Sequence, residues 1–203
     1  MSKAKKYYDL IHVEPHGYIP RIGLHRFGLT FKSKEPHHGK SVAVIQMNGS
    51  KAGPKEKKKW KCDSTIGKVL SWCYENPKTP FETVHCLNLF SYVDPHPENL
   101  MYLDKATLNK IENDYWIKHV CENIDYIILA YGDCKGIDSM IVQNRINDVL
   151  AWLEKYDLYR VGDLTKKGNP KHGRSWNYSP LLTLHKNRKL PKANIRTTGR
   201  GNF

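Results

Sequence analysis

Four polar residues, far apart in the chain, have side chains that suit hydrolytic chemistry. They are Asn48, Asp63, Asn88 and His172. A carboxylate can orient or activate water, a carboxamide can hold a water or read the edge of a ligand, and an imidazole can stabilise a developing anion. Such a set could cleave a bond whose breaking leaves a positive charge on one fragment and a negative charge on the other. The carboxylate would stabilise the positive fragment, and the imidazole would stabilise the negative one.

Each of the four residues also has a plain structural interpretation, which stays open at this point. Asn48 precedes a glycine, as in a tight turn, and Asp63 is a good helix cap. Asn88 could satisfy backbone groups at a strand end, and His172 could be one more phosphate contact in a basic loop. The joint pattern favours a site, because all four residues stand next to expected strands or helices.

Hydrophobic patterning predicts four strands that alternate with three helices. The apolar run 41–47 is typical of a strand that is covered on both faces. The other expected strands are 84–90, 124–131 and 158–161, and the expected helices are 63–75, 105–121 and 137–156. Tyr-, Ile-, Val- and Phe-rich segments at 6–13 and 21–32 add an N-terminal strand pair.

This order predicts an α/β protein with three layers, αβα, around a central, mostly parallel four-stranded sheet. We expect a single domain over 1–185, which includes the strand pair at 6–32, and a basic tail over 186–203. In such sheets ligands bind outside the carboxyl ends of the strands. Those ends would bring the candidate residues together.

The charge distribution indicates a polyanionic partner. The net charge is +13, yet 62–164 holds nine basic and sixteen acidic residues, whereas 165–203 holds ten Lys or Arg and no acid. A further six lysines lie in 51–61. Positive charge that is segregated in this way favours nucleic acid as the partner.

Several classes of protein are disfavoured by what the sequence lacks. The five cysteines include no CxxC pair, His37 and His38 are adjacent in a loop, and no phosphate-binding or dinucleotide-binding glycine motif is present. We therefore expect no metal and no cofactor. No run approaches the ~18 apolar residues of a membrane span, so we expect a cytoplasmic monomer that does not contact a membrane.

The motifs around these residues resemble a bacterial and phage family known as domain of unknown function 1643. The family pattern reads Asn-Pro-Ser-Thr-Ala, Asp-Pro-Thr-Ile, Asn-Leu-Phe, Asn-Asp, Trp-Gly and Leu-Thr-Lys-x-Gly-x-Pro-x-His-Pro. This chain has the corresponding stretches 48–52, 63–66, 88–90, 113–114, 131–132 and 164–172. Gly49 and Gly173 stand where the pattern prefers Pro, and Tyr131 stands where it favours Trp, which implies loops of different shape.

At one remove, the layout resembles the uracil-DNA glycosylase superfamily. That resemblance implies catalytic roles for Asn48, Asp63 and His172: the first holds water or the sugar, the second orients water and the third stabilises the departing base. Asn88 would read the edge of the base. The substrate-binding set that follows is Gly49, Ser50, Asn88, Phe90, Tyr131 and Gly132.

Basic and aromatic residues around these loops supply candidate DNA contacts. They are Lys55, Lys57, Lys58, Lys59, Lys61, Lys166, Lys167, Lys171, Arg174 and Trp176. The expected function is a DNA glycosylase that hydrolyses the N-glycosidic bond of an unusual or modified base. A family that includes phages and mobile bacterial genomes implies modified viral DNA as the substrate and a role in antiviral defence. The alternatives are a non-catalytic nucleic-acid-binding module and an enzyme of free nucleosides or nucleotides.

Overall fold

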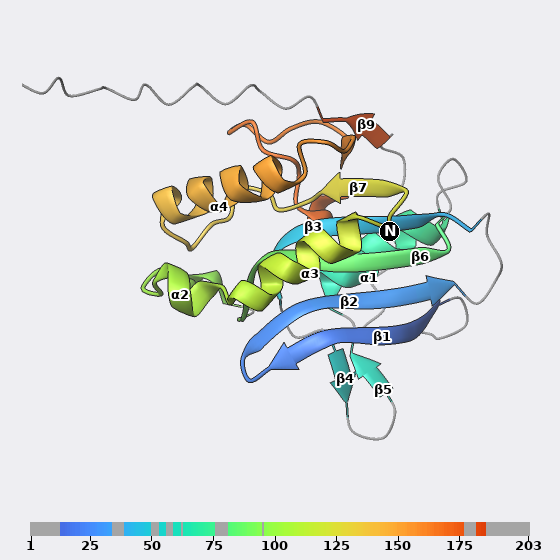
Figure 1. Ribbon diagram of the computed structural model, residues 1–203, viewed down its shortest axis with the longest axis horizontal. Coiled ribbons are helices and arrows are strands. Elements are labelled where there is room, and N and C mark those ends of the chain that lie inside the picture. The colour runs from blue at the N-terminus through green and yellow to red at the C-terminus, as the bar shows by residue number, and fades with distance from the viewer. Residues whose placement is uncertain are drawn as a thin grey trace, which may run out of the picture.

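The computed structural model describes residues 13–33, 39–49, 53–55, 59–61, 63–75, 81–94, 96–176 and 182–185. They form a mixed α/β fold with a seven-stranded sheet and a separate two-stranded hairpin (Figure 1). The expectations for Ser50, Lys57, Lys58 and the tail 186–203 lie outside the described residues. Only the backbone is described at Lys55, Lys59 and Lys61.

The seven strands lie in the order β1-β2-β6-β3-β7-β8-β9 across the sheet. Their bounds are β1 Val13–Ile22, β2 His25–Ser33, β3 Ser41–Gly49, β6 Thr83–Val93, β7 Tyr126–Leu129, β8 Leu158–Val161 and β9 Leu182–Leu184. The hairpin consists of β4 Gly53–Lys55 and β5 Lys59–Lys61, and it falls within the lysine-rich insert after β3.

The neighbouring strands β6, β3, β7 and β8 run parallel, whereas β1, β2 and β9 pair antiparallel at the edges. The expected α/β class is confirmed, but the sheet is mixed and has seven strands rather than four. β3 is central because Val42 to Met47 are all buried, which requires cover on both faces.

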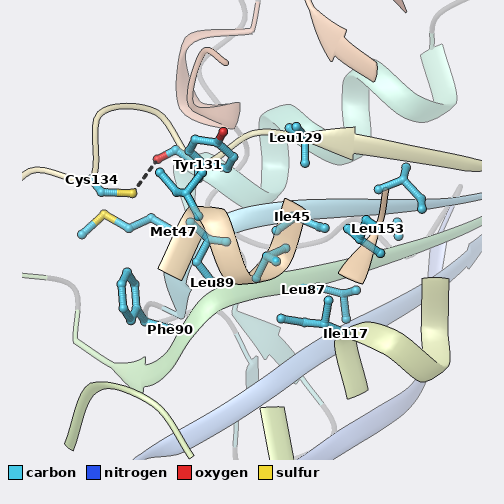
Figure 2. Packing of buried hydrophobic residues seen from close by; sticks show 14 of the residues in the cluster. Ile45, Met47, Leu87, Leu89, Phe90, Ile117, Leu129, Tyr131, Cys134 and Leu153 are labelled. Atoms are coloured by element: carbon cyan, nitrogen blue, oxygen red, sulfur yellow. Dashed lines mark hydrogen bonds between the residues drawn. The ribbon is translucent and has the colours of Figure 1, made fainter. Parts of the chain in front are cut away.

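Helices cover both faces of the sheet (Figure 1). The bounds are α1 Ser64–Glu75, α2 Lys105–Leu108, α3 Ile111–Cys121 and α4 Ser139–Trp152, with short 3₁₀ turns η1 Pro97–Leu100 and η2 Gly173–Ser175. Val42 and Val44 pack in one cluster with α1. Ile45 packs on the other face with Ile117 of α3 and Leu153 that follows α4, as Figure 2 shows.

Three details differ from the expected elements. The expected strand 6–13 lies outside the described residues except for Val13, and the expected strand 21–32 divides between the end of β1 and β2, which turn at Gly23, a glycine with φ +55°. The expected helix 105–121 breaks because Asn109 and Lys110 are extended and the Lys110 N–H donates to Ser91 Oγ. The expected helix 137–156 begins one residue after its cap, Asp138.

Across the described residues, no helix combines the length and the apolar character that a membrane crossing needs.

Candidate active site at the carboxyl edge of the sheet

Asp63 caps the helix that follows the lysine-rich insert. Its Oδ1 accepts hydrogen bonds from the N–H groups of Thr65 and Ile66, at 2.9 and 2.8 Å. This confirms the capping interpretation of the sequence. The cap also fixes the carboxylate at the amino end of α1, the end that lies at the carboxyl edge of the sheet because α1 returns the chain from β3 to the parallel strand β6.

His172 lies between the end of β7 and the first turns of α1. A Cβ added to Gly132 would stand 2.9 Å from His172 Cβ, and one added to Gly173 would stand 2.6 Å from Val69 Cγ2. Gly132 also has φ +67° and donates its N–H to Pro170 O. These two glycines let the histidine loop approach both β7 and α1, and the Val69 contact explains why residue 173 has no side chain.

Asp63 and His172 interact electrostatically, although 108 residues separate them in the chain. Burial lowers the pKa of the His172 imidazole below its ordinary value. The Asp63 carboxylate opposes that shift, and the Arg174 guanidinium adds to it. The imidazole is therefore neutral at pH 7.

The hydrogen bonding of His172 fixes where its proton lies. Nδ1 accepts the backbone N–H of Arg174 at 3.2 Å. A neutral imidazole with Nδ1 as acceptor carries its hydrogen on Nε2. His172 therefore presents an uncharged N–H donor within the electrostatic influence of Asp63, and such a donor can form a hydrogen bond to an anion.

Asn48 lies near the carboxyl end of β3, the neighbour of β7 in the sheet. The register pairs Ile45 with Leu129, the last residue of β7, and Ala130 donates its N–H to Ile45 O, so Asn48 lies three residues beyond that pair. β3 and β7 are also the point at which the order of the parallel strands reverses, the usual place for a ligand. The Asn48 amide nitrogen donates to Gly49 O and Asp94 O, which holds its side chain at this edge.

Gly49 is closely surrounded. A Cβ there would lie 3.0 Å from Val93 Cγ2 and 3.1 Å from Arg26 Nη2. The two side chains explain why glycine stands where the family pattern has proline. Asn88, which pairs with Gln46 of β3, is buried and donates its amide N–H to Arg26 O, so part of its hydrogen bonding supports the sheet.

Gln46 is a site residue that the sequence reasoning missed. Its side chain is 4% exposed, and its Nε2 has no hydrogen-bond partner among the described residues. A buried donor without a partner costs about 1–3 kcal/mol. The signal was present in the sequence, since Gln46 is the one carboxamide inside the apolar run 41–47.

The basic loop after β8 is held to the turn that follows β7. Asp133 Oδ1 accepts hydrogen bonds from Thr165 Oγ1 at 2.6 Å and from Asn169 Nδ2 at 2.9 Å. These bonds hold the pKa of the Asp133 carboxyl below its usual range. Lys166 and Lys167 are exposed on this loop, so two cationic side chains reach solvent from an anchored backbone.

The other basic candidates are partly engaged. Lys171 lies 4.0 Å from Asp163, and Arg174 is exposed.

Three of the predicted contact residues are buried in the core instead. Phe90 and Tyr131 pack in the cluster on the α3–α4 face, as Figure 2 shows. Trp176 is 5% exposed, stacks edge-on against Trp72 at 5.2 Å and donates its indole N–H to Lys171 O. Its apolar ring fills space between η2 and α1, so we remove Trp176 from the DNA-contacting set.

The Asn-Asp stretch of the family pattern belongs to a buried network on the α3–α4 face. Arg145 is 2% exposed, pairs with Asp114 at 2.7 Å and donates to Leu89 O at 2.6 Å. Asn113 donates to Asn88 O and Leu89 O. The network therefore ties α3 and α4 to the end of β6.

Within the described residues, no group of three or more His, Cys, Asp or Glu side chains could hold a metal ion.

The chain matches the family of proteins of unknown function DUF1643 over residues 26–173, about three quarters of its length. It belongs to the DUF1643 family. The match begins at Arg26 and ends at Gly173, so it includes the Asp63 cap, Gly132 and His172. No curated protein and no solved structure matched the chain.

Proposed function

We propose that this DUF1643 protein is a monofunctional DNA glycosylase that removes an unusual or modified base and leaves an abasic site. The observation that carries the proposal is that His172 Nδ1 accepts the Arg174 N–H, which leaves Nε2 to carry the hydrogen, while the Asp63 carboxylate acts on the same imidazole electrostatically. Hydrolysis of an N-glycosidic bond needs this pair: an anionic group near the sugar and a donor near the departing base.

In the proposed reaction, water attacks C1′ of the deoxyribose while the bond from C1′ to the base nitrogen breaks. The bonding electron pair leaves with the base, and the Nε2–H of His172 donates to the base as its negative charge develops. Asp63 stabilises the positively charged sugar and orients the water, and its carboxylate accepts the water proton as the new C–O bond forms; that proton then passes to the departed base, which leaves neutral. Asn48 holds the water or the sugar.

A base inside a duplex must leave the stack to reach such a site, at a cost on the order of a few kcal/mol. Contacts to the phosphate backbone can offset that cost. Lys166, Lys167 and Arg174 are exposed on the loop that contains His172, and the β4–β5 hairpin carries Lys55, Lys59 and Lys61 along the chain just before Asp63. We propose that these cations hold the DNA.

The resemblance to uracil-DNA glycosylases supports the proposal in one respect: it implies an amide, a carboxylate and a histidine at the carboxyl ends of parallel strands, and we propose Asn48, Asp63 and His172 for these roles. We propose modified phage DNA as the substrate, with antiviral defence as the role.

The test incubates the protein with genomic DNAs that carry different natural base modifications and identifies freed bases by mass spectrometry. We expect alkali-labile abasic sites in at least one DNA. Asn48→Ala and Asp63→Ala should abolish them, and Asp63→Asn, which keeps a capping side chain but removes the charge, should reduce release at least ~100-fold.

Asp138→Asn is the matched control, because Asp138 caps α4 through the same pair of backbone bonds. It should release bases at the rate of the unaltered protein. Salt-sensitive DNA binding without any freed base would instead support the non-catalytic binding module. Full activity in both Asn48→Ala and Asp63→Ala would contradict the site assignment.

A further inference from the structure

Gln46 is a buried carboxamide at the centre of the carboxyl edge. It follows Val42 and Val44 at two-residue spacing on β3, and both valines pack in the cluster with α1. Its register partner on β6 is Asn88. Gln46 therefore lies on the α1 side of the sheet, two residues before Asn48 on β3, and Asp63 caps the helix that covers this side.

The neighbours of Gln46 leave its amide N–H₂ without an acceptor. Asn88 directs its own amide N–H to Arg26 O on the next strand. On the β7 side, Ala130 follows Ile128 in the α1 cluster and offers only a methyl group. Among the described residues, Nε2 of Gln46 has no hydrogen-bond partner, although the side chain is 4% exposed.

We propose that Gln46 is a specificity-determining residue, whose amide N–H₂ donates to a carbonyl oxygen of the target base. This inference rests on the proposed function only in placing a base at this edge. The amide donor has no partner in the fold, so it gains a hydrogen bond when a base with a carbonyl oxygen binds. A base without a carbonyl gives it no such bond and should bind more weakly. The amide nitrogen of Gln46 is buried in this structure. A base can therefore reach it only if the side chains that cover it move.

The chemistry predicts which bases bind. Uracil and hypoxanthine carry a ring carbonyl, whereas pyrimidine and purine are the same rings without exocyclic oxygen. A site that reads the carbonyl through Gln46 binds the first pair at least ~10-fold more tightly than the second. Base stacking contributes to both pairs alike, so the difference isolates the hydrogen bond.

The experiment measures binding of these four free bases to the full chain by calorimetry and, in parallel, its melting temperature. Gln46→Met keeps the length of the side chain without the donor. It should erase the preference for carbonyl-bearing bases and leave the melting temperature unchanged or higher, because removing an unmet buried donor costs the fold nothing.

Gln143→Met is the control, since Gln143 is exposed on α4 and donates to Asn147. It should keep the preference. The proposal is overturned if the unaltered protein does not distinguish the two pairs, if Gln46→Met retains the preference, or if Gln46→Met melts at a lower temperature, which would show that the fold satisfies the amide. A protein that prefers carbonyl-bearing bases but releases none from DNA would sink the glycosylase proposal alone.

Discussion

The two faces of the carboxyl edge carry polar clusters of opposite character. On the α3–α4 face, Arg145 and Asn113 are buried and direct their donors at Asp114 and at backbone carbonyls of β6. On the α1 face, Asp63, Asn48 and His172 are only half-buried, and backbone groups hold them in place. The side chains of the α3–α4 cluster use their hydrogen bonds within the protein and stabilise the fold. The side chains of the α1 cluster are positioned by backbone groups and keep other polar atoms available for a ligand.

The largest effect should come from breaking the α3–α4 cluster. Arg145→Met leaves Asp114 and Leu89 O without their buried partner, so we expect a loss of about 3–5 kcal/mol in the free energy of unfolding. Chemical denaturation measures it. Lys105→Met removes an exposed pair with Asp148 at 3.8 Å and should cost less than ~1 kcal/mol. Equal losses in the two variants would show that the Arg145 cluster is not structural.

Substitutions on the α1 face should lower the rate of base release more than they lower stability. Gly132→Ala places a methyl group against His172 and forces alanine to φ +67°, so we expect at least ~10-fold slower base release. Gly23→Ala is the control, because it carries similar backbone strain at φ +55° with nothing within 4 Å of the added Cβ.

Both glycine variants should lose about 1–2 kcal/mol of stability, but only Gly132→Ala should lose activity. If Gly23→Ala slows base release as much, the effect comes from strain in general and not from the position of His172.

The pH profile sharpens the same contrast. Burial lowers the pKa of His172, so the neutral form that donates from Nε2 persists below the ordinary value of 6.5. Base release should stay constant as the pH falls from 7.5 to 6.5 and decline only at lower pH, where protonation of Nδ1 breaks the hydrogen bond from the Arg174 N–H that holds the ring in place. A decline centred above 6.5 would contradict the neutral-donor role.

The smallest effect is expected at Asp133, which holds the basic loop after β8 through two hydrogen bonds. Asp133→Asn weakens the bonds from Thr165 and Asn169 and should cost about 1 kcal/mol at pH 7. Because the pKa of Asp133 is lowered in the fold, its contribution is present above the unfolded value of 3.8 and is lost as the pH falls through the lower folded value.

The difference in unfolding free energy between the unaltered protein and Asp133→Asn should therefore shrink in acid. Asp157→Asn, at an exposed turn, should change stability by less than ~0.5 kcal/mol at either pH. A gap between the unaltered protein and Asp133→Asn that does not change with pH would rule out the charge as its cause.

The sequence predicted those parts of the fold that follow from local signals. The run 41–47 is typical of a covered strand, and Asp63 before an amphipathic segment is a good helix cap; the structure has both. The break at Asn109 was not predictable, because it depends on a bond from Lys110 to Ser91, nineteen residues away.

The candidate site was predicted only in outline, for a related reason. We expected strand order to bring Asp63 and His172 to the same edge of the sheet, and the two side chains interact electrostatically. Trp176 was misassigned because its burial depends on a contact with Trp72, about a hundred residues earlier. Gln46 was overlooked because its unmet amide is visible only once its neighbours are placed.

The most direct measurement is the rate of base release by His172→Ala, beside His119→Ala, which alters an exposed histidine on α3. The account predicts a fall of at least ~100-fold for His172→Ala, with unchanged release for His119→Ala and a folded protein in both cases. Release by His172→Ala within about twofold of the unaltered rate would contradict the account.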